Sequence, residues 1–376
     1  MESPLSSCQI RRPLWLALAA TALLSAAACS PERDGVLIAA AGNWDEGYGV
    51  MNKRGIDLAV EQINQEGGVW GRPLRVTMRN DKGEGARAVS IAAEFVANKE
   101  IVAVVGHVNS GTMIAAARVY DEGLPAVSTT ASTPDLTGIS PWVFRVISSD
   151  SVNGLDLARY ASAQGFKRAA VLYENNAYGR GLAQSFERNF RGTVVASDPV
   201  PSDRAGNFEP FVSWLALHTP DVVFVAGTEG SGLAILREAR RQQLTTAFLG
   251  SDGWTGIVDD TTLSEGAHVG APFTPQDPRD EVQRFAADFR QRFGMEPDGN
   301  AALAYDATRL VARAVAEGGA SREGVRRWLS TRTRESAVPG VTGSIAFQPS
   351  GDVIGKGYVM TRVRRGALVV EGARRP

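Results

Sequence analysis

Small hydroxyl side chains and one carboxylate stand at the ends of apolar runs in this chain, and such groups suit binding rather than bond cleavage. The apolar run that begins at Ile101 ends in a glycine-rich turn that carries Ser110. The next apolar run ends in a hydroxyl cluster that contains Thr130 and Ser132. Hydroxyls and free backbone N–H groups at a helix start favour a small anion such as a carboxylate. The alternative is that Ser110 only caps a helix and that the hydroxyl cluster is only a turn.

A second set of side chains complements an anion site. Asp252 follows the apolar run at 247–250 and can accept hydrogen bonds from an ammonium group. Tyr48 and Tyr178 offer flat apolar faces with a polar tip, which suits closing over a small ligand. Thr228 lies in a second glycine-rich turn, 227–232. Together these groups fit a zwitterion, whose two charges both need partners once water is expelled. Alternatively, the tyrosines are surface aromatics and Asp252 is a turn or cap residue.

Signatures of catalysis, metals and cofactors are absent from the sequence. It contains no G-x-G-x-x-G motif after a first strand, no P-loop and no G-x-S-x-G elbow. The three histidines, His107, His218 and His268, lack metal-ligand spacing. His107 adjoins the Ser110 turn and can reach a ligand there, but a structural histidine held by backbone groups is the favoured interpretation. We therefore expect no enzyme activity, no cofactor and no metal.

Strands and helices alternate along the chain, and this alternation must position the binding groups. Continuous runs of β-branched residues indicate strands buried on both faces, which is typical of parallel sheets. The pattern predicts an α/β fold in which successive loops emerge at the carboxyl edge of a sheet, where such folds bind ligands. The pattern restarts near Asp150, and two similar strand–turn–helix units, around Ser110 and Thr228, indicate two similar lobes. The expected helices include 55–65, 112–122 and 233–242, with loops at 41–49 and 251–254 and a strand at 343–347.

The first residues indicate export. Arg11 and Arg12 precede a short apolar segment, and small residues then lead into Cys29, which is typical of a secretory signal over residues 1–28. The small residues before Cys29 also resemble a bacterial lipoprotein signal, in which Cys29 is acylated; ordinary cleavage after Ala28 is the alternative. Without residues 1–28 the chain keeps 38 basic and 40 acidic side chains and no cysteine pair. This balance argues against nucleic acid or an anionic membrane surface as a partner.

Several segments in order resemble one known family. INQEGGVWGRPL, GHVNSGT, STTASTPDLT and VFRV occur in the first part of the chain, and NAYGRGLAQSF, FLGSDGW and TGSIAFQPSGD follow. Over nearly the whole mature chain the sequence resembles the type I periplasmic binding proteins of branched-chain amino acid ABC transporters, the Leu/Ile/Val-binding group. This resemblance implies two Rossmann-like lobes with parallel sheets, joined by three crossovers, with the ligand in the cleft between them.

The resemblance also implies boundaries and roles. Residues 29–34 would form a lipid-anchor or linker segment, 35–149 and 273–352 the first lobe, and 150–272 and 353–376 the second. Ser110, Thr130 and Ser132 match positions that bind the ligand carboxylate, and Asp252 matches the position that binds its ammonium. Tyr48, Tyr178 and Thr228 match positions that line the pocket. The chain departs from the family at Asn109, where a cysteine is usual, at Thr228 and Glu229, where tyrosines are common, and at Asp252, where Glu is usual.

The sequence therefore predicts an exported, periplasmic and lipid-anchored solute-binding protein of an ABC importer. Its ligand would be an amino acid or similar zwitterion, and its partners the permease subunits. Two other classes stay open: a ligand-sensing ectodomain or regulatory subunit on the same fold, and a secreted α/β hydrolase. Relatives that bind urea, amides or aromatic acids also leave the ligand open.

Overall fold

The computed structural model describes residues 1–2, 35–202 and 205–371, and the chain from Val36 onwards forms one compact unit. Cys29, the 29–34 segment and the signal segment after its second residue lie outside the described residues, so their expected roles stay predictions. None of the described helices combines the length and the apolar character that crossing a membrane requires.

The first of two sheets carries strands in the order β2-β1-β3-β4-β5, all parallel. Alternate residues of β1 face opposite sides: Ile38 packs with the cluster of α2, α11 and α12, and Ala39 with that of α3 and α4. The strand β3 is buried along its whole length, as its run of β-branched residues predicts. The elements of this layer are β1 Val36–Gly42, α2 Gly47–Gln65, β2 Leu74–Asn80, α3 Gly85–Ala97, β3 Ile101–Gly106, α4 Ser110–Tyr120, β4 Ala126–Ser128, β5 Val143–Arg145, α11 Gly299–Gly318 and α12 Arg322–Ser330.

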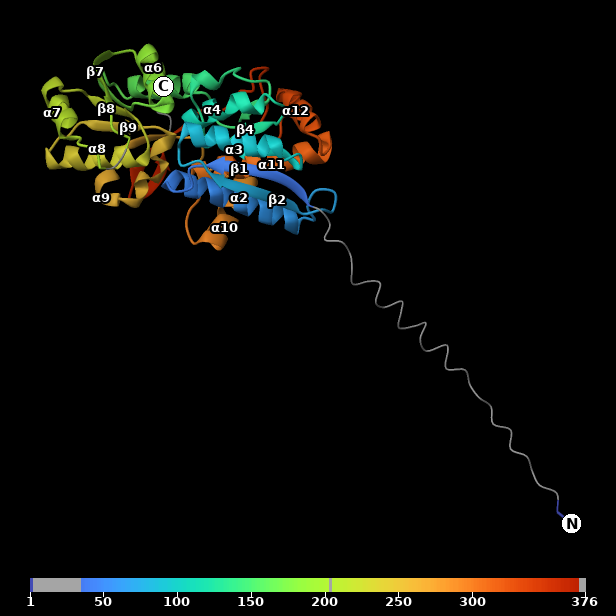
Figure 1. Cartoon of the computed structure of the whole chain (residues 1–376). Helices are drawn as coiled ribbons and strands as arrows, with labels where there is room; N and C mark the ends of the chain where they lie inside the picture. Colours follow the sequence, from blue (N-terminus) through green and yellow to red (C-terminus); the bar gives the residue numbers. More distant parts are fainter. Residues whose placement is uncertain (3–34, 203–204, 372–376) are drawn as a thin grey trace. The chain divides into compact units, whose positions relative to one another are not determined.

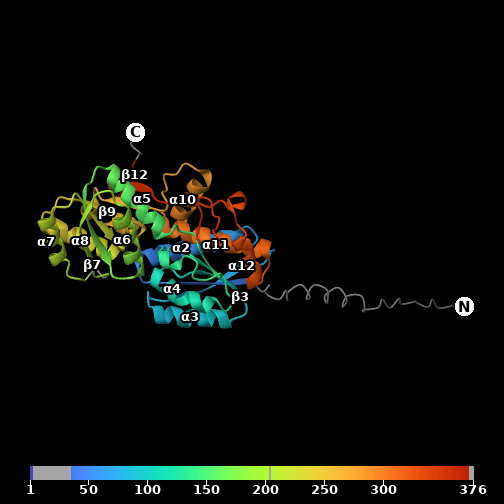
Figure 2. The same cartoon turned by 90° about the horizontal axis from the view of Figure 1, so that it is seen from above.

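The second sheet has the order β12-β11-β10-β9-β8-β6-β7, with β6 to β10 parallel and the β11–β12 hairpin antiparallel at its edge. Helices α5 and α6 cover one face, and α7 and α8 cover the other. Figures 1 and 2 show the two layered groups of helices and strands. The elements are α5 Asp150–Ala163, β6 Arg168–Glu174, α6 Ala177–Asn189, β7 Thr193–Val200, α7 Glu209–His218, β8 Val222–Ala226, α8 Glu229–Arg241, β9 Ala247–Gly250, α9 Thr261–Ser264, β10 His268–Ala271, β11 Val359–Arg364 and β12 Ala367–Val370.

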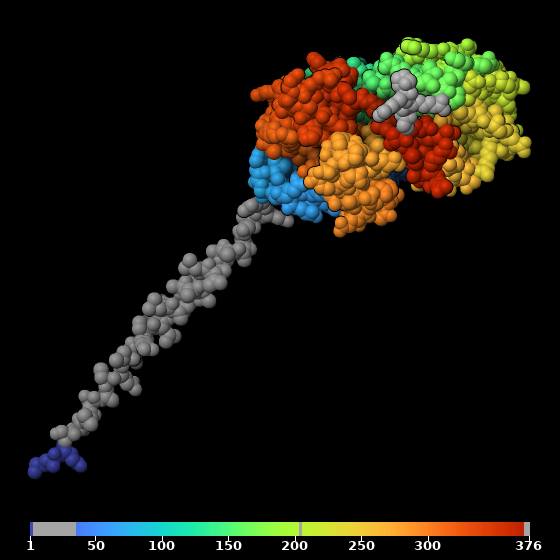
Figure 3. Space-filling view, turned by 180° about the vertical axis from the view of Figure 1, so that it is seen from behind, coloured from blue at the N-terminus to red at the C-terminus, as the bar shows by residue number. Residues whose placement is uncertain are grey.

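The chain passes between the two sheets three times, which confirms the expected α/β fold of two lobes with three crossovers. It leaves the first sheet after β5, returns after β10 through α10 (Asp280–Phe293), and leaves again before β11. The face in Figure 3 shows the orange segment with α10 beside the red C-terminal strands, where Gln276 Nε2 donates to Leu368 O at 3.2 Å. At the first crossover, Arg145 is buried and pairs with Asp352 at 2.6 Å.

Some expected element boundaries are wrong, and the reasons are local. The helix α2 begins at Gly47 rather than Gly55, so Tyr48 lies in its first turn and not in a loop. Glycines weaken a helix pattern, but Gly49 is needed because an added Cβ would lie 1.7 Å from Asn43 O. Asp252 begins a 3-10 helix, Asp252–Asp259 (η2), rather than a loop. The expected strand at 343–347 is reduced to two isolated bridges, Val338 with Ile345 and Phe347 with Val353.

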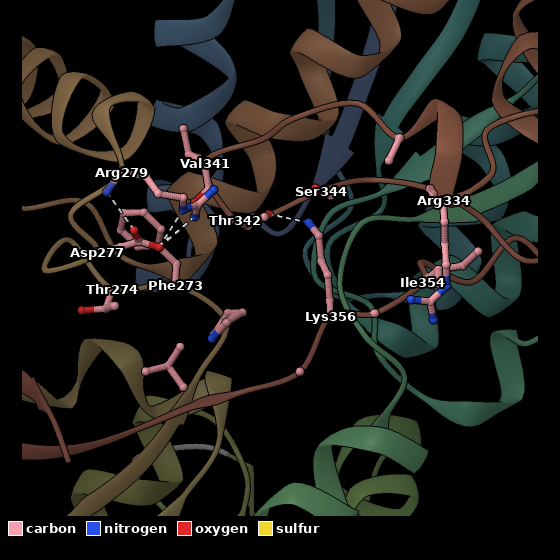
Figure 4. Close-up of a pocket in the computed structure, with 17 residues that line it drawn as sticks. Phe273, Thr274, Asp277, Arg279, Arg334, Val341, Thr342, Ser344, Ile354 and Lys356 are labelled. Atoms are coloured by element: carbon pink, nitrogen blue, oxygen red, sulfur yellow. Dashed lines mark hydrogen bonds and ion pairs between the residues drawn. The ribbon is translucent and has the colours of Figure 1, made fainter. Parts of the chain in front are cut away.

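A cavity of about 460 Å³ opens at the second and third crossovers, lined by residues from segments 272–279, 334–346 and 354–359 (Figure 4). Lys356 extends into it, and its Nζ donates to Thr342 Oγ1 at 2.5 Å. Thr342 Oγ1 in turn donates to Asp306. Burial lowers the pKa of Lys356 to about 8, against the opposing charge of Asp306. The charged lysine is therefore poorly compensated at neutral pH.

This environment makes Lys356 a test of pH-dependent stability. Because its folded-state pKa lies below the unfolded value, the unfolded chain binds more protons between pH 8 and 10.5, and this group's contribution to the unfolding free energy rises with pH across that window. We expect Lys356→Met to raise the melting temperature at pH 7, and the gain to shrink towards pH 10. Thermal unfolding at pH 7 to 10 measures this, with exposed Lys167→Met as control. If Lys356→Met raised the melting temperature equally at every pH, the gain would not come from removal of the lysine charge.

Candidate functional site

The carboxyl ends of strands from both sheets border a cavity of about 600 Å³. This is the edge at which parallel α/β sheets bind ligands, because the loops that follow the strands converge there. Six of the residues expected in a binding site line it: Tyr48, Ser110, Thr130, Tyr178, Thr228 and Asp252. They come from two stretches of sequence that the first crossover separates, so the fold itself brings them together.

One end of the cavity presents hydrogen-bond donors at the start of α4. Ser110 is the first residue of this helix, and its Oγ accepts from Thr133 N at 3.3 Å, which leaves its hydroxyl proton free to donate. The first backbone N–H groups of a helix have no acceptor within the helix. Ser110, Gly111 and Thr112 all line the cavity. This end can therefore hold a carboxylate. Thr130 Oγ1 donates to Val108 O at 2.9 Å, so its hydroxyl can only accept.

The other end carries Asp252, which belongs to a buried pair of carboxylates; its neighbour Asp150 is not part of the cavity lining. Asp252 accepts from Tyr178 Oη at 2.8 Å and from Tyr358 Oη at 2.5 Å. Burial raises the pKa of Asp252. Burial, and then the negative charge of Asp252, raise the pKa of the neighbouring Asp150 to about 8, against hydrogen bonds from Asn153 and Ser132. Two buried carboxylates whose charges repel each other favour a proton or an incoming cation between them.

Tyr48 and Tyr178 are held in place by their hydroxyls. Tyr48 Oη accepts from Asn109 Nδ2 at 2.9 Å and from Asn43 Nδ2 at 3.3 Å, and burial raises its pKa to about 12. Tyr178 Oη bonds both Ser251 and Asp252. Both phenols therefore stay neutral at physiological pH, and both rings form fixed walls of the cavity.

Two residues near the expected site lie elsewhere. Ser132 does not line the cavity: it is buried, and its Oγ donates to Asp150 Oδ2 at 3.0 Å. His107 is also fully buried, with Asp81 Oδ2 at 2.7 Å from Nδ1 and Tyr120 Oη at 2.9 Å from Nε2. His107 is thus a structural residue, held by side chains and not by the backbone groups that the sequence interpretation invoked.

Sequence reasoning missed several lining residues. Glu174 ends β6, and its Oε1 accepts from Thr228 N, Thr228 Oγ1 and Ser231 Oγ within 2.8 Å. The hydroxyl of Thr228 is therefore committed to Glu174. The position of Glu174 at a strand end could have revealed it, but Asn300 lies on α11, far along the chain, and no local pattern marks it. The other missed polar residues of the lining are Asn43, Glu46, Asn109, Thr112, Asn176 and Ser202.

Two α/β lobes with a polar cavity at their strand ends define a protein that binds a small molecule between lobes. In the described part of the chain, no three His, Cys, Asp or Glu side chains are placed to hold a metal ion. The comparisons with known proteins agree with this class.

The model of the periplasmic binding protein family matches residues 35–367. A leucine-, isoleucine-, valine-, threonine- and alanine-binding protein of Pseudomonas aeruginosa is 29% identical over 350 residues, which cover 89% of this chain and 91% of the relative. A substrate-binding protein of an ABC transporter from Desulfitobacterium hafniense, solved with leucine, is 31% identical, with a TM-score of 0.78 and coverage of 90% and 100%. LivJ of Streptococcus pneumoniae, solved with isoleucine, is 25% identical, with a TM-score of 0.82 and coverage of 89% and 98%. The chain belongs to the type I periplasmic binding proteins of the branched-chain amino acid group.

Proposed function

We propose that this protein binds an α-amino acid in the 600 Å³ cavity and delivers it to the permease of an ABC importer. The observation that carries the proposal is the pairing of opposite chemistries across one cavity. Donors at the start of α4 face a cavity whose other end holds Asp252. Each end satisfies one charge of a zwitterion, and an α-amino acid carries both charges on adjacent groups.

The site residues then have distinct roles. Ser110 and the first N–H groups of α4 bind the carboxylate, and Asp252, oriented by Tyr178, binds the ammonium. Tyr48 closes one side of the cavity. Thr130 accepts a ligand hydrogen bond, whereas Ser132 and Thr228 act indirectly through Asp150 and Glu174.

The proposal includes the cellular setting. Family membership supports an extracytoplasmic binding protein, and we propose that residues 1–28 direct export and that acylated Cys29 anchors the mature chain in the periplasm. The proposed lobes are 35–149 with 273–352, and 150–272 with 353–376. Because the chemistry of binding is divided between lobes, a ligand that contacts both favours their closure, and the permease would recognise that closed form.

A ligand screen tests the function directly. A ligand that binds only the folded state raises its stability by about 2.7 kcal/mol at a hundredfold excess over Kd. We expect a thermal shift with at least one α-amino acid, and none with the amine or the carboxylic acid that lacks one of the two charges. Shifts with urea, amides or benzoate, and none with amino acids, would refute the zwitterion site.

Ser110→Ala tests the carboxylate end. A hydrogen bond to a charged group contributes about 1.5–3 kcal/mol, so we expect affinity for the amino acid to fall roughly 10- to 150-fold. Isothermal titration calorimetry measures the change. Ser90→Ala is the matched control, because Ser90 is an exposed helical serine of α3 whose Oγ donates only to Ala86 O. An unchanged affinity in Ser110→Ala would place the carboxylate elsewhere.

A further inference from the structure

The charges that line the cavity are not balanced. Glu46, Glu174 and Asp252 line it, and none of its described lining residues is a lysine, arginine or histidine. One carboxylate suffices for the ammonium of an α-amino acid, so two acidic groups are left over.

Few of the side chains that line the cavity are aliphatic. Among the described lining residues, the aliphatic side chains are those of Val108 and Ala205. The methyl groups of the threonines and the rings of the two tyrosines supply the other apolar atoms of the side chains. The lining otherwise consists of asparagines, serine hydroxyls and carboxylates. A leucine side chain would remove water from these polar groups without replacing its hydrogen bonds, which costs binding free energy. The cavity therefore offers a branched aliphatic side chain few aliphatic contacts.

The two extra carboxylates act on the same part of the cavity. Glu46 precedes α2 in the first lobe, and Glu174 ends β6 in the second. Both line the cavity together with Tyr48, and the negative charge of each contributes to the raised pKa of this tyrosine. Asp252 lies at the other tyrosine, Tyr178. Glu46 and Glu174 thus add negative charge to the cavity beyond that of Asp252.

The partners of these carboxylates differ. Glu174 Oε1 accepts a hydrogen bond from Thr228 N at the start of α8. Its Oε2 accepts only from Asn176 Nδ2, at 2.9 Å. No ion pair or hydrogen bond of the Glu46 side chain occurs among the described residues. A third acid, Glu229, reaches the same helix start, since its Oε2 lies 3.1 Å from where a Cβ of Gly47 would be. Glu46 thus keeps its capacity to pair with a ligand.

We propose that the ligand is a cationic amino acid of the lysine, ornithine or arginine type, whose side-chain cation lies between Glu46 and Glu174. This inference rests on the proposed function, because it uses the same cavity and the same zwitterion ends. It assigns specificity to Glu46, a residue whose removal disturbs no hydrogen bond of the described fold.

Matched ligand pairs test it. Isothermal titration calorimetry of the protein with lysine against norleucine, and arginine against citrulline, compares side chains of similar shape with and without charge. We expect the cationic member of at least one pair to bind more than 10-fold tighter, with a preference that weakens in high salt. Glu46→Gln should reduce this preference roughly 5-fold, because it weakens binding of the cationic ligand more than binding of the uncharged one. The control Glu122→Gln, at an exposed position outside the cavity, should change neither.

The outcomes separate the inference from the function on which it rests. If leucine or norleucine binds as tightly as lysine, the cationic preference is wrong and the zwitterion site stands. If the preference is present but survives Glu46→Gln intact, the assignment to Glu46 is overturned. If no α-amino acid binds, while a ligand without an ammonium does, the proposed function itself fails.

Discussion

Asp252→Asn is expected to abolish measurable binding of an α-amino acid. The substitution keeps the shape of the side chain and removes the charge, and a buried ion that loses its partner costs about 3–5 kcal/mol, a factor of roughly 100 to several thousand in Kd. Asp252 is 8% exposed, so water cannot replace the lost counter-charge. Calorimetric titration gives the affinity, and thermal unfolding without ligand shows whether the fold is intact.

A control on the same helix separates the binding charge from local structure. Asp259 ends η2 and is exposed, so Asp259→Asn should bind like the unmodified protein. A ligand in which a hydroxyl replaces the amine adds a second comparison: the unmodified protein should discriminate strongly against it, and Asp252→Asn should not. Undiminished affinity of Asp252→Asn for the amino acid would refute the assigned role.

Ligand affinity is expected to rise with pH, by up to tenfold per pH unit, as pH approaches 8 from below. The pKa of Asp150 is raised to about 8 because this carboxyl is buried beside Asp252, so the unliganded pair keeps a proton at neutral pH. An ammonium group that enters favours the charged carboxylates, lowers that pKa and expels the proton. Each binding event therefore releases close to one proton when the pH lies between the ordinary pKa range of a carboxyl group and 8. Calorimetry at pH 7 in buffers with different ionisation enthalpies counts the protons released.

Asp150→Asn is the variant that tests this linkage. Asparagine occupies the same volume and cannot titrate, so proton release on binding should largely disappear and the affinity should become nearly independent of pH. The pH dependence of the unfolding free energy, measured without ligand, gives a second test of this titration. The folded state holds the extra proton between about pH 4 and 8, so the pair's contribution to the unfolding free energy falls as pH rises through that range, and the variant should lose this slope. Proton release that persists in Asp150→Asn would locate the titrating group elsewhere.

The sequence by itself determined the layered architecture and the places where binding groups stand. Runs such as Ile101–Gly106 can be satisfied only as strands covered on both faces, and the helices between them force the sheet to be parallel. Residues just after such strands meet at one edge, so Ser110, Thr130 and Asp252 could be assigned to the cavity from their positions alone. These features depend on local periodicity and on the common direction of the strands in a parallel sheet.

Only the tertiary structure decided which partner each of these side chains takes. Ser132 bonds Asp150 across the first crossover, and Thr228 donates to Glu174, so neither hydroxyl is left for the ligand in the way that its position suggested. Tyr358 donates to Asp252 although 106 residues separate them, because the C-terminal hairpin returns to the second sheet. The raised pKa of Asp150 likewise needs the burial and the proximity of Asp252. Hydrogen-bond partners and electrostatic fields depend on distances across the fold, and local sequence patterns carry no information about those distances.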